Sequence, residues 1–257
     1  MNTIVTKFGG SSLADSIHFK KVKNIIEGNS ERKYVVPSAP GKRFSKDFKV
    51  TDLLYLCHAH VNSGISLDDV FKLISERYHS IVNELDLNFD LNSHLEIIKK
   101  DIENGASVDY AASRGEYLNG LILANYLGID FIDAKDVIKF NKYGSLNMEE
   151  TYSLLKDKLS IHERAVIPGF YGSDEHGDIV TFSRGGSDVT GALVAASINA
   201  KLYENWTDVS GFLMADPRIV NNPKKIKTIT YGELRELSYR GASVLHEEAV
   251  FPVRTSG

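Results

Sequence analysis

Residues 181–196, TFSRGGSDVTGALVAA, are the part of the chain best suited to bind an anion. A β-branched run is followed by glycines and then by an apolar helical pattern. This strand–turn–helix order presents free backbone N–H groups and the positive end of a helix dipole to an anion. Ser187 or Asp188 is a candidate N-cap, and Arg184 adds a planar donor for a carboxylate or phosphate. An ordinary turn is the alternative, but the arginine favours an anion site.

A second candidate anion site is KFGGSS, residues 7–12, directly after the first β-rich run. Gly9 and Gly10 would let a phosphate approach the backbone, and Lys7 supplies a mobile positive charge. The lysine precedes the glycines, so the segment is not a Walker A motif. Taken alone, a plain turn with a solvated lysine explains the segment equally well.

Two further turns with polar residues follow predicted strands. Residues 36–43, VPSAPGKR, form a small-residue turn, and residues 205–211, NWTDVSG, place a hydroxyl and a carboxylate at a strand end. Arg218 comes soon afterwards and would either face a nucleotide phosphate or lie on the surface. Ligands of parallel α/β sheets bind beyond the carboxyl ends of the strands, which is where these turns fall.

The segment SRGE, residues 113–116, interrupts an apolar helical pattern with a glycine and two charges. A glycine inside a helix costs about 1 kcal/mol relative to alanine, so Gly115 needs a packing or access reason. It would let a ligand approach and leave Glu116 aimed at a cation. A surface pair between Arg114 and Glu116 is the alternative, and the segment by itself favours that alternative.

These segments need a scaffold of short strands that alternate with longer helices. Strands are predicted at residues 3–8, 34–36, 130–132, 165–167, 179–182 and 202–206. Helical spacing of apolar residues predicts helices around 19–26, 70–85, 110–124 and 234–239. This alternation is typical of an α/β fold with a mostly parallel sheet that is covered on both faces.

The composition is that of an ordinary globular protein of 257 residues, and a formal net charge of −4 gives no general attraction to nucleic acid or an anionic membrane. Cys57 is the only cysteine in the sequence, which excludes an internal disulfide; its leucine neighbours predict a buried thiol on a helix. The sequence lacks a leader pattern and a membrane-spanning apolar run, so we expect a cytoplasmic protein.

Taken together, these segments resemble the aspartate kinases of the amino-acid kinase superfamily. The matching segments, in the family's order, are KFGGSS (7–12), SRGE (113–116), RGGSD (184–188), WTDVSGFLMADPRIV (206–220) and GASVLHEEAVFPV (241–253). The resemblance implies a three-layer α/β/α sandwich with an open, mostly parallel sheet. It also implies transfer of the ATP γ-phosphoryl group to the β-carboxylate of L-aspartate. The product would be 4-phospho-L-aspartate, at the start of lysine, threonine and methionine biosynthesis.

The same resemblance assigns roles to individual residues. Lys7 and Asp188 are the expected catalytic residues: Lys7 would neutralise charge on the transferring group, and Asp188 would orient nearby groups. Glu116 would hold the substrate ammonium and Arg184 a substrate carboxylate. The other expected substrate-binding residues are Ser38, Thr51 and Ser187. The other expected ATP-binding residues are Gly9, Gly10, Ser11, Thr207, Asp208, Leu213 and Arg218.

ATP is the expected co-substrate and Mg²⁺ the expected cofactor. Mg²⁺ keeps several waters and binds substrate phosphates, so no dedicated protein metal site is expected. No general base is needed, because a carboxylate is already ionised at neutral pH. Positioning and charge neutralisation would then do the catalysis.

The chain departs from the family pattern at Ser243, where many members have lysine, and at Leu213, where tyrosine is frequent. Ser183 replaces a common glycine, which is a mild change. The lost cation would weaken nucleotide binding, unless a nearby lysine replaces it. The candidates are Lys224, Lys225 and Lys227.

One catalytic domain is expected over residues 1–257, with an amino-acid lobe at 1–172 and a nucleotide-binding lobe at 173–257. The ACT domains that usually follow in this family have no counterpart in the sequence, so we do not predict feedback inhibition through them. Homodimer formation stays open.

Other functions compete with an active aspartate kinase. A catalytically weakened nucleotide- or amino-acid-binding regulatory subunit is the alternative from another class, and Ser243 motivates it. Kinases of glutamate, N-acetylglutamate, carbamate or a nucleotide monophosphate are the enzymatic alternatives; SRGE with RGGSD favours a substrate with a free ammonium and a carboxylate. A dinucleotide-binding dehydrogenase lacks support, because no GxGxxG follows the first strand.

Overall fold

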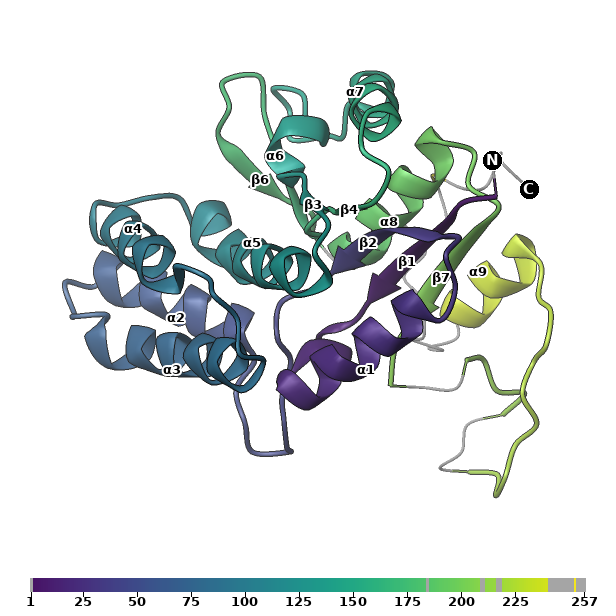
Figure 1. Ribbon diagram of the computed structural model, residues 1–257, viewed down its shortest axis with the longest axis horizontal. Coiled ribbons are helices and arrows are strands. Elements are labelled where there is room, and N and C mark those ends of the chain that lie inside the picture. Colours follow the sequence, from purple (N-terminus) through teal and green to yellow (C-terminus); the bar gives the residue numbers. More distant parts are fainter. Residues whose placement is uncertain (1, 184, 209–210, 216–218, 240–251, 253–257) are drawn as a thin grey trace.

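A parallel sheet forms the centre of the molecule (Figure 1). The computed structural model describes residues 2–183, 185–208, 211–215, 219–239 and 252. The sheet has the order β3-β4-β2-β1-β7, and all its pairings are parallel. Its strands are β1 (Ile4–Phe8), β2 (Arg32–Pro37), β3 (Asp130–Phe131), β4 (Ala165–Val166) and β7 (Leu202–Trp206). The predicted mostly parallel α/β fold is therefore confirmed.

Helices cover both faces of this sheet, and Figure 1 shows the layers. One face carries α1 (Ser16–Glu27) and α5 (Val108–Leu127), with α2 (Val50–Asn62), α3 (Asp68–Glu84) and α4 (Leu91–Glu103) packed outside α5. The other face carries α6 (Ala134–Val137), α7 (Met148–Ser160) and α8 (Gly186–Ser197). The 3₁₀ helix η1 (Gly10–Leu13) follows β1, and α9 (Tyr231–Tyr239) comes late in the chain.

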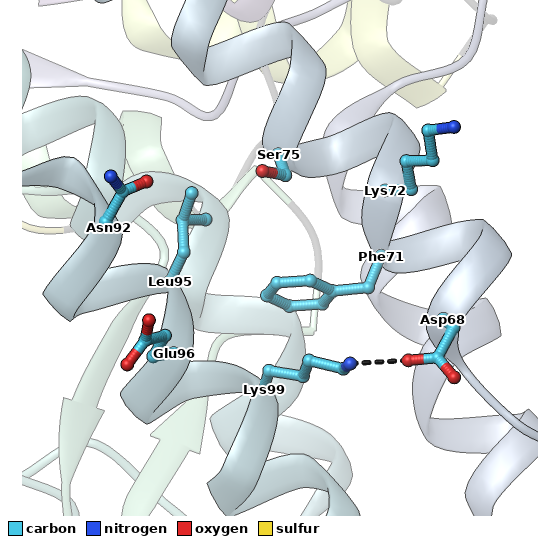
Figure 2. A pocket seen from close by; sticks show the side chains of 8 residues that line it. All are labelled: Asp68, Phe71, Lys72, Ser75, Asn92, Leu95, Glu96 and Lys99. Atoms are coloured by element: carbon cyan, nitrogen blue, oxygen red, sulfur yellow. Dashed lines mark hydrogen bonds and ion pairs between the residues drawn. The ribbon is translucent and has the colours of Figure 1, made fainter.

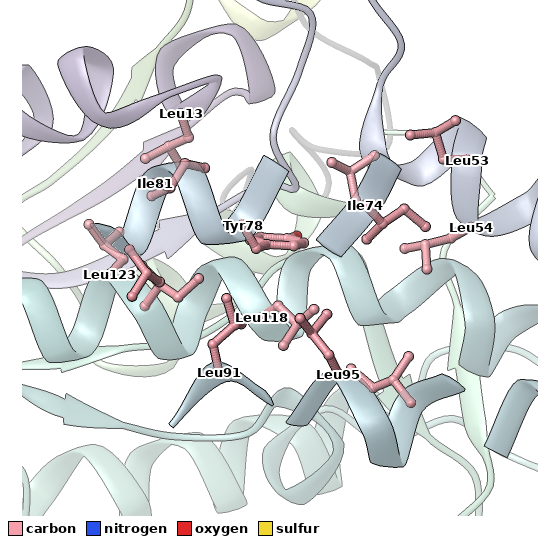
Figure 3. Close-up of a cluster of buried hydrophobic side chains, with 14 of the residues drawn as sticks. Leu13, Leu53, Leu54, Ile74, Tyr78, Ile81, Leu91, Leu95, Leu118 and Leu123 are labelled. Atoms are coloured by element: carbon pink, nitrogen blue, oxygen red, sulfur yellow. The ribbon is translucent and has the colours of Figure 1, made fainter. Parts of the chain in front are cut away.

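The alternation of side chains along β1 and β2 produces two apolar cores. Phe8 and Val35 face the α1–α5 side, whereas Val5 and Val36 face the α7–α8 side. All four side chains are fully buried. Strands that are buried on both faces read as continuous β-branched and aromatic runs, which explains why the sequence pattern located them. Figure 3 shows part of the first core, where Tyr78 lies among leucines and isoleucines.

The predicted strand at 179–182 lies outside the central sheet. It forms β6 (Ile179–Thr181), which pairs antiparallel with β5 (Tyr171–Ser173). The expected boundary between the lobes, at residues 172 and 173, falls within β5 of this hairpin. The division into an amino-acid lobe and a nucleotide lobe stays a prediction. The two expected lobes share one sheet, because β7 of the second pairs directly with β1 of the first.

Cys57 lies on α2 and is fully buried, as its leucine neighbours predict. Burial raises the pKa of its thiol to about 12.

Among the described helices, three were not predicted from the spacing of apolar residues: α4, α6 and α7. Within the described part of the chain, no helix combines the length and apolar character needed to cross a membrane.

Candidate active site

The predicted glycine turns meet at the carboxyl edge of the sheet because β1, β2, β4 and β7 run in the same direction. The backbone N–H of Gly9 donates to Trp206 O at the end of β7 (3.0 Å). The N–H of Ser38 donates to Phe8 O at the end of β1 (3.0 Å). These bonds place the turns after β1, β2 and β7 side by side.

Lys7 and Asp188 form a buried ion pair at this edge. The distance from Lys7 Nζ to Asp188 Oδ1 is 2.6 Å, and about nine-tenths of each side chain is buried. Lys7 pairs in register with Asn205 of β7, whose Nδ2 also donates to Asp188 Oδ1 (3.0 Å). The ammonium is close to the glycine turn: a Cβ at Gly9 would be 3.7 Å from Lys7 Nζ. A positive charge is thus held beside backbone that a phosphate can approach.

The turn after β2 packs directly on the turn after β1. The N–H of Gly41 donates to Gly10 O (2.8 Å). A Cβ at Gly41 would lie 2.6 Å from the carbonyl carbon of Gly10, and one at Gly10 would lie 2.8 Å from Ala39 O. Both positions therefore require glycine for close approach.

Glu116 faces the same turn from α5 and is buried, with 5% of its surface exposed. Burial raises the pKa of its carboxyl to about 8, against the opposing effects of the Ala39 N–H and of Arg114. Its Oε2 has no hydrogen-bond partner among the described residues. A buried carboxylate with a free oxygen is an unsatisfied acceptor, and an ammonium ion would satisfy it.

The surface-pair interpretation of SRGE is wrong. Arg114 and Glu116 are both buried, and Arg114 stacks on the rings of Tyr110, Tyr117 and Tyr171 instead. Residues two apart on a helix point to different faces, so the two charges cannot pair directly. The glycine between them has a packing reason: a Cβ at Gly115 would lie 2.8 Å from the Ala39 Cβ.

The start of α8 differs from the prediction. Its N-cap is Gly185, whose φ of 58° lies in the left-handed region, and neither Ser187 nor Asp188 caps the helix. The Asp188 carboxylate is instead engaged by Lys7. Ser187 contacts the turn after β4, since a Cβ at Gly169 would lie 2.6 Å from the Ser187 Oγ.

The remaining predicted residues are less closely tied to this cluster. Thr207 lies beside the glycine turn, 3.9 Å from a Cβ at Gly9, and donates to Asp208 Oδ1 (3.2 Å). Ser11 is in η1 and Thr51 is in the first turn of α2, both half-buried. Leu213 bridges to Lys225, one of the candidate replacement cations, through the backbone. Arg184, Arg218 and Ser243 lie outside the described residues.

Two amides that were not predicted from the sequence also lie in the site. Asn205 holds Asp188, and Asn119 on α5 donates to Ser38 O (2.6 Å). The side-chain oxygens of both amides are buried without a partner in the described part of the chain. Asn119 follows Glu116 by three residues, so it shares its helix face; a fully buried amide on that face is a signal that helical spacing contains.

Two cavities in the described part of the chain lie away from this cluster. A groove of about 320 Å³ lies between α3 and α4, with buried Phe71 and Leu95 in its wall, and Figure 2 shows the ion pair between Lys99 and Asp68 that crosses it. A cavity of about 630 Å³ is formed by residues from 226–237. Neither contains a predicted site residue. Among the described residues, no group of three or more His, Cys, Asp or Glu could hold a metal ion.

Comparison with known proteins relates this geometry to a family. Residues 2–257 match the amino acid kinase family. Aspartokinase 3 of Bacillus subtilis is 39% identical over 270 residues, which cover 98% of this chain and 59% of that protein.

Two solved structures are also similar. The aspartate kinase of Clostridium acetobutylicum superposes with a TM-score of 0.95 at 66% identity, covering 99% of this chain and 58% of that one. Aspartokinase III of E. coli, in complex with aspartate and ADP, gives a TM-score of 0.84 at 26% identity and covers 99% and 60%. The chain therefore spans less than two thirds of the length of these relatives. It belongs to the amino acid kinase family.

Proposed function

We propose that this chain carries the catalytic domain of an aspartate kinase, which transfers the γ-phosphoryl group of ATP to the β-carboxylate of L-aspartate. The observation that carries the proposal is the buried Glu116 carboxylate with an unpartnered oxygen beside the glycine turns. That acceptor suits the free ammonium of an amino acid. The similarity to aspartokinases, one of which was solved in complex with aspartate and ADP, supports the same assignment.

In this proposal a β-carboxylate oxygen of aspartate attacks the γ-phosphorus. The new O–P bond forms as the bond from phosphorus to the β,γ-bridging oxygen breaks, and ADP leaves with the electron pair. Lys7 stabilises the negative charge on the transferring group. Asp188 holds the Lys7 ammonium in place, and Asn205 in turn holds the Asp188 carboxylate. No proton has to be removed from the nucleophile.

The oxygen atoms near Lys7 also suit a magnesium nucleotide. Asp188 supplies a carboxylate, and Asn205 supplies an amide oxygen that has no partner among the described residues. Such hard oxygen donors are the ligands that Mg²⁺ takes, together with phosphates and water. Mg²⁺ would supply charge neutralisation at the β- and γ-phosphates.

Trapping of acyl phosphate as the hydroxamate tests the proposal, with ATP, Mg²⁺ and L-aspartate. Glutamate, N-acetylglutamate and a reaction without substrate are run beside it. A signal with aspartate alone is expected. Lys7→Ala should lower kcat more than it raises the KM for aspartate, whereas Lys201→Ala, an exposed lysine paired with Glu31, should change neither. No signal from folded protein that still binds ATP would favour the weakened regulatory subunit instead.

A further inference from the structure

Arg77 is the most deeply buried member of an ion-pair network outside the described cluster. It lies on α3, and only 4% of its side chain is exposed. Its Nη2 donates to Asp47 Oδ2 (2.6 Å), and its Nη1 donates to Gly41 O (2.9 Å). A buried arginine normally needs such partners, because an unpaired buried charge is costly. The positions of these partners in the fold indicate what Arg77 does.

The partners of Arg77 belong to the two turns that carry the site. Gly41 O and Asp47 are in the turn after β2, and Arg77 Nη1 also contacts Ala14 O, directly after η1 (3.4 Å). Arg43 also binds the Asp47 carboxylate, with Nε–Oδ2 and Nη2–Oδ1 distances of 2.8 and 3.0 Å. The guanidinium thus joins the end of one turn to the middle of the other.

This junction is one peptide away from the proposed phosphate-binding backbone. Arg77 binds the carbonyl of Gly41, and the N–H of Gly41 donates to Gly10 O. The two backbone segments are closely packed at this contact, since a Cβ at Gly41 would lie 2.8 Å from Ser11 N. A shift of Gly41 therefore moves Gly10 or opens the contact.

The same helix also supports the other half of the site. Tyr78, adjacent to Arg77 and fully buried, donates from its hydroxyl to Gly115 O (2.7 Å), next to Glu116. Figure 3 shows this ring surrounded by apolar side chains, which leaves it little freedom to move. Consecutive residues of α3 thus contact the turn at Gly41 and the helix that carries Glu116.

We propose that Arg77 is a positioning residue for phosphoryl transfer: its guanidinium sets the distance between the turn after β2 and the glycine turn after β1. Because reaction rates depend steeply on the alignment of the reacting atoms, a displacement of about 1 Å can lower turnover by about 100-fold. The kinetic part of this inference rests on the proposed function. The nucleotide-binding part needs only ATP.

Arg77→Met tests the inference, with Tyr34→Phe as the matched control. Tyr34 is a buried side chain that also donates to two backbone carbonyls, those of Leu159 and His162, on the opposite face of the sheet. The folded fraction of each variant is measured by circular dichroism and used to correct the enzyme concentration. On this basis we expect kcat to fall by about 100-fold in Arg77→Met. Its affinity for MgATP, measured by calorimetry, should fall as well. Arg77→Lys should recover part of both, and Tyr34→Phe should be less stable than wild type with unchanged kinetics.

Gly41→Ala keeps the test decisive where Arg77→Met does not fold, because it disturbs the same contact without touching the ion pairs. We expect the same loss of kcat and of MgATP affinity. Wild-type kinetics in either folded variant, or equal losses in Tyr34→Phe, would overturn the inference. If wild type binds MgATP but does not phosphorylate aspartate, the proposed function fails. The MgATP affinities of the variants then decide the inference alone.

Discussion

Aspartate binding should release a proton from Glu116 at neutral pH. Burial, partly opposed by the Ala39 N–H and Arg114, raises the pKa of this carboxyl from 4.5 to about 8 in the free protein, so its surroundings together disfavour the charged form by about 5 kcal/mol. At pH 7 about nine-tenths of the free molecules therefore carry a neutral Glu116. An ammonium ion placed on the unpartnered Oε2 favours the charged form and drives the proton off.

The sign of the pH dependence follows from this linkage. The dissociation constant for aspartate should decrease about tenfold from pH 6 to 7 and about fivefold from pH 7 to 8, because each binding event must first remove a proton. Above pH 8 it should level off. The stability of the free protein should move the other way, falling as pH rises from about 4.5 through about 8, because the folded state holds a proton that the unfolded chain has released.

Titration calorimetry in two buffers of different ionisation enthalpy measures the proton release directly. We expect about 0.9 proton per aspartate at pH 7 and close to none above pH 9. Glu116→Gln should abolish the release and weaken aspartate binding by at least about 30-fold, the equivalent of about 2 kcal/mol. A dissociation constant that does not change between pH 6 and 8, with no proton release, would mean that Glu116 is already ionised in the free protein.

Three further substitutions or reagents probe the packing of the site. Gly115→Ala, whose Cβ would meet Ala39 at 2.8 Å, should lower stability by about 1–3 kcal/mol and raise the KM for aspartate; an unchanged melting temperature and KM would contradict this packing. Gly169→Ala should displace Ser187 and raise the same KM more than the KM for ATP, which steady-state kinetics can separate. The buried thiol of Cys57 should resist maleimide at pH 7 until the protein unfolds, and rapid native labelling seen by mass spectrometry would argue against its burial.

The fold could be predicted because its central strands, β1 and most of β2, are buried on both faces. The run at residues 3–8 is apolar enough to be recognised on its own, and as β1 it pairs with the half-exposed run at 202–206, which forms β7. Residues 179–181 have the same composition but form a hairpin with β5, because strand composition reports burial and not partner. The helix α4 was missed although Leu91, Leu95, Ile98 and Ile102 keep helical spacing along it.

The site was predictable where backbone chemistry dictates the residue type. The glycines at 10 and 115 are required by close approach, and this constraint is local enough to be visible in the sequence. Arg77 leaves a weaker mark: it lies between Ile74 and Ile81 on the buried face of a helix, where a charge is unusual. Its partners are 30 and 36 residues away, so no local pattern identifies them.

The contact between Gly10 and Gly41 explains why Lys7, which would bind phosphate, and Glu116, which would bind the substrate ammonium, belong to one site. On one side of it, Lys7 is already paired with Asp188, so the positive charge is in place before any phosphate arrives. On the other side, the raised pKa of Glu116 keeps its carboxyl mainly protonated at pH 7 until a cation binds. A preorganised cation costs little reorganisation during transfer, whereas the carboxyl must ionise for each substrate that binds. We therefore expect changes at the Gly10–Gly41 contact to reduce kcat, and changes at Glu116 to act first on the affinity for aspartate.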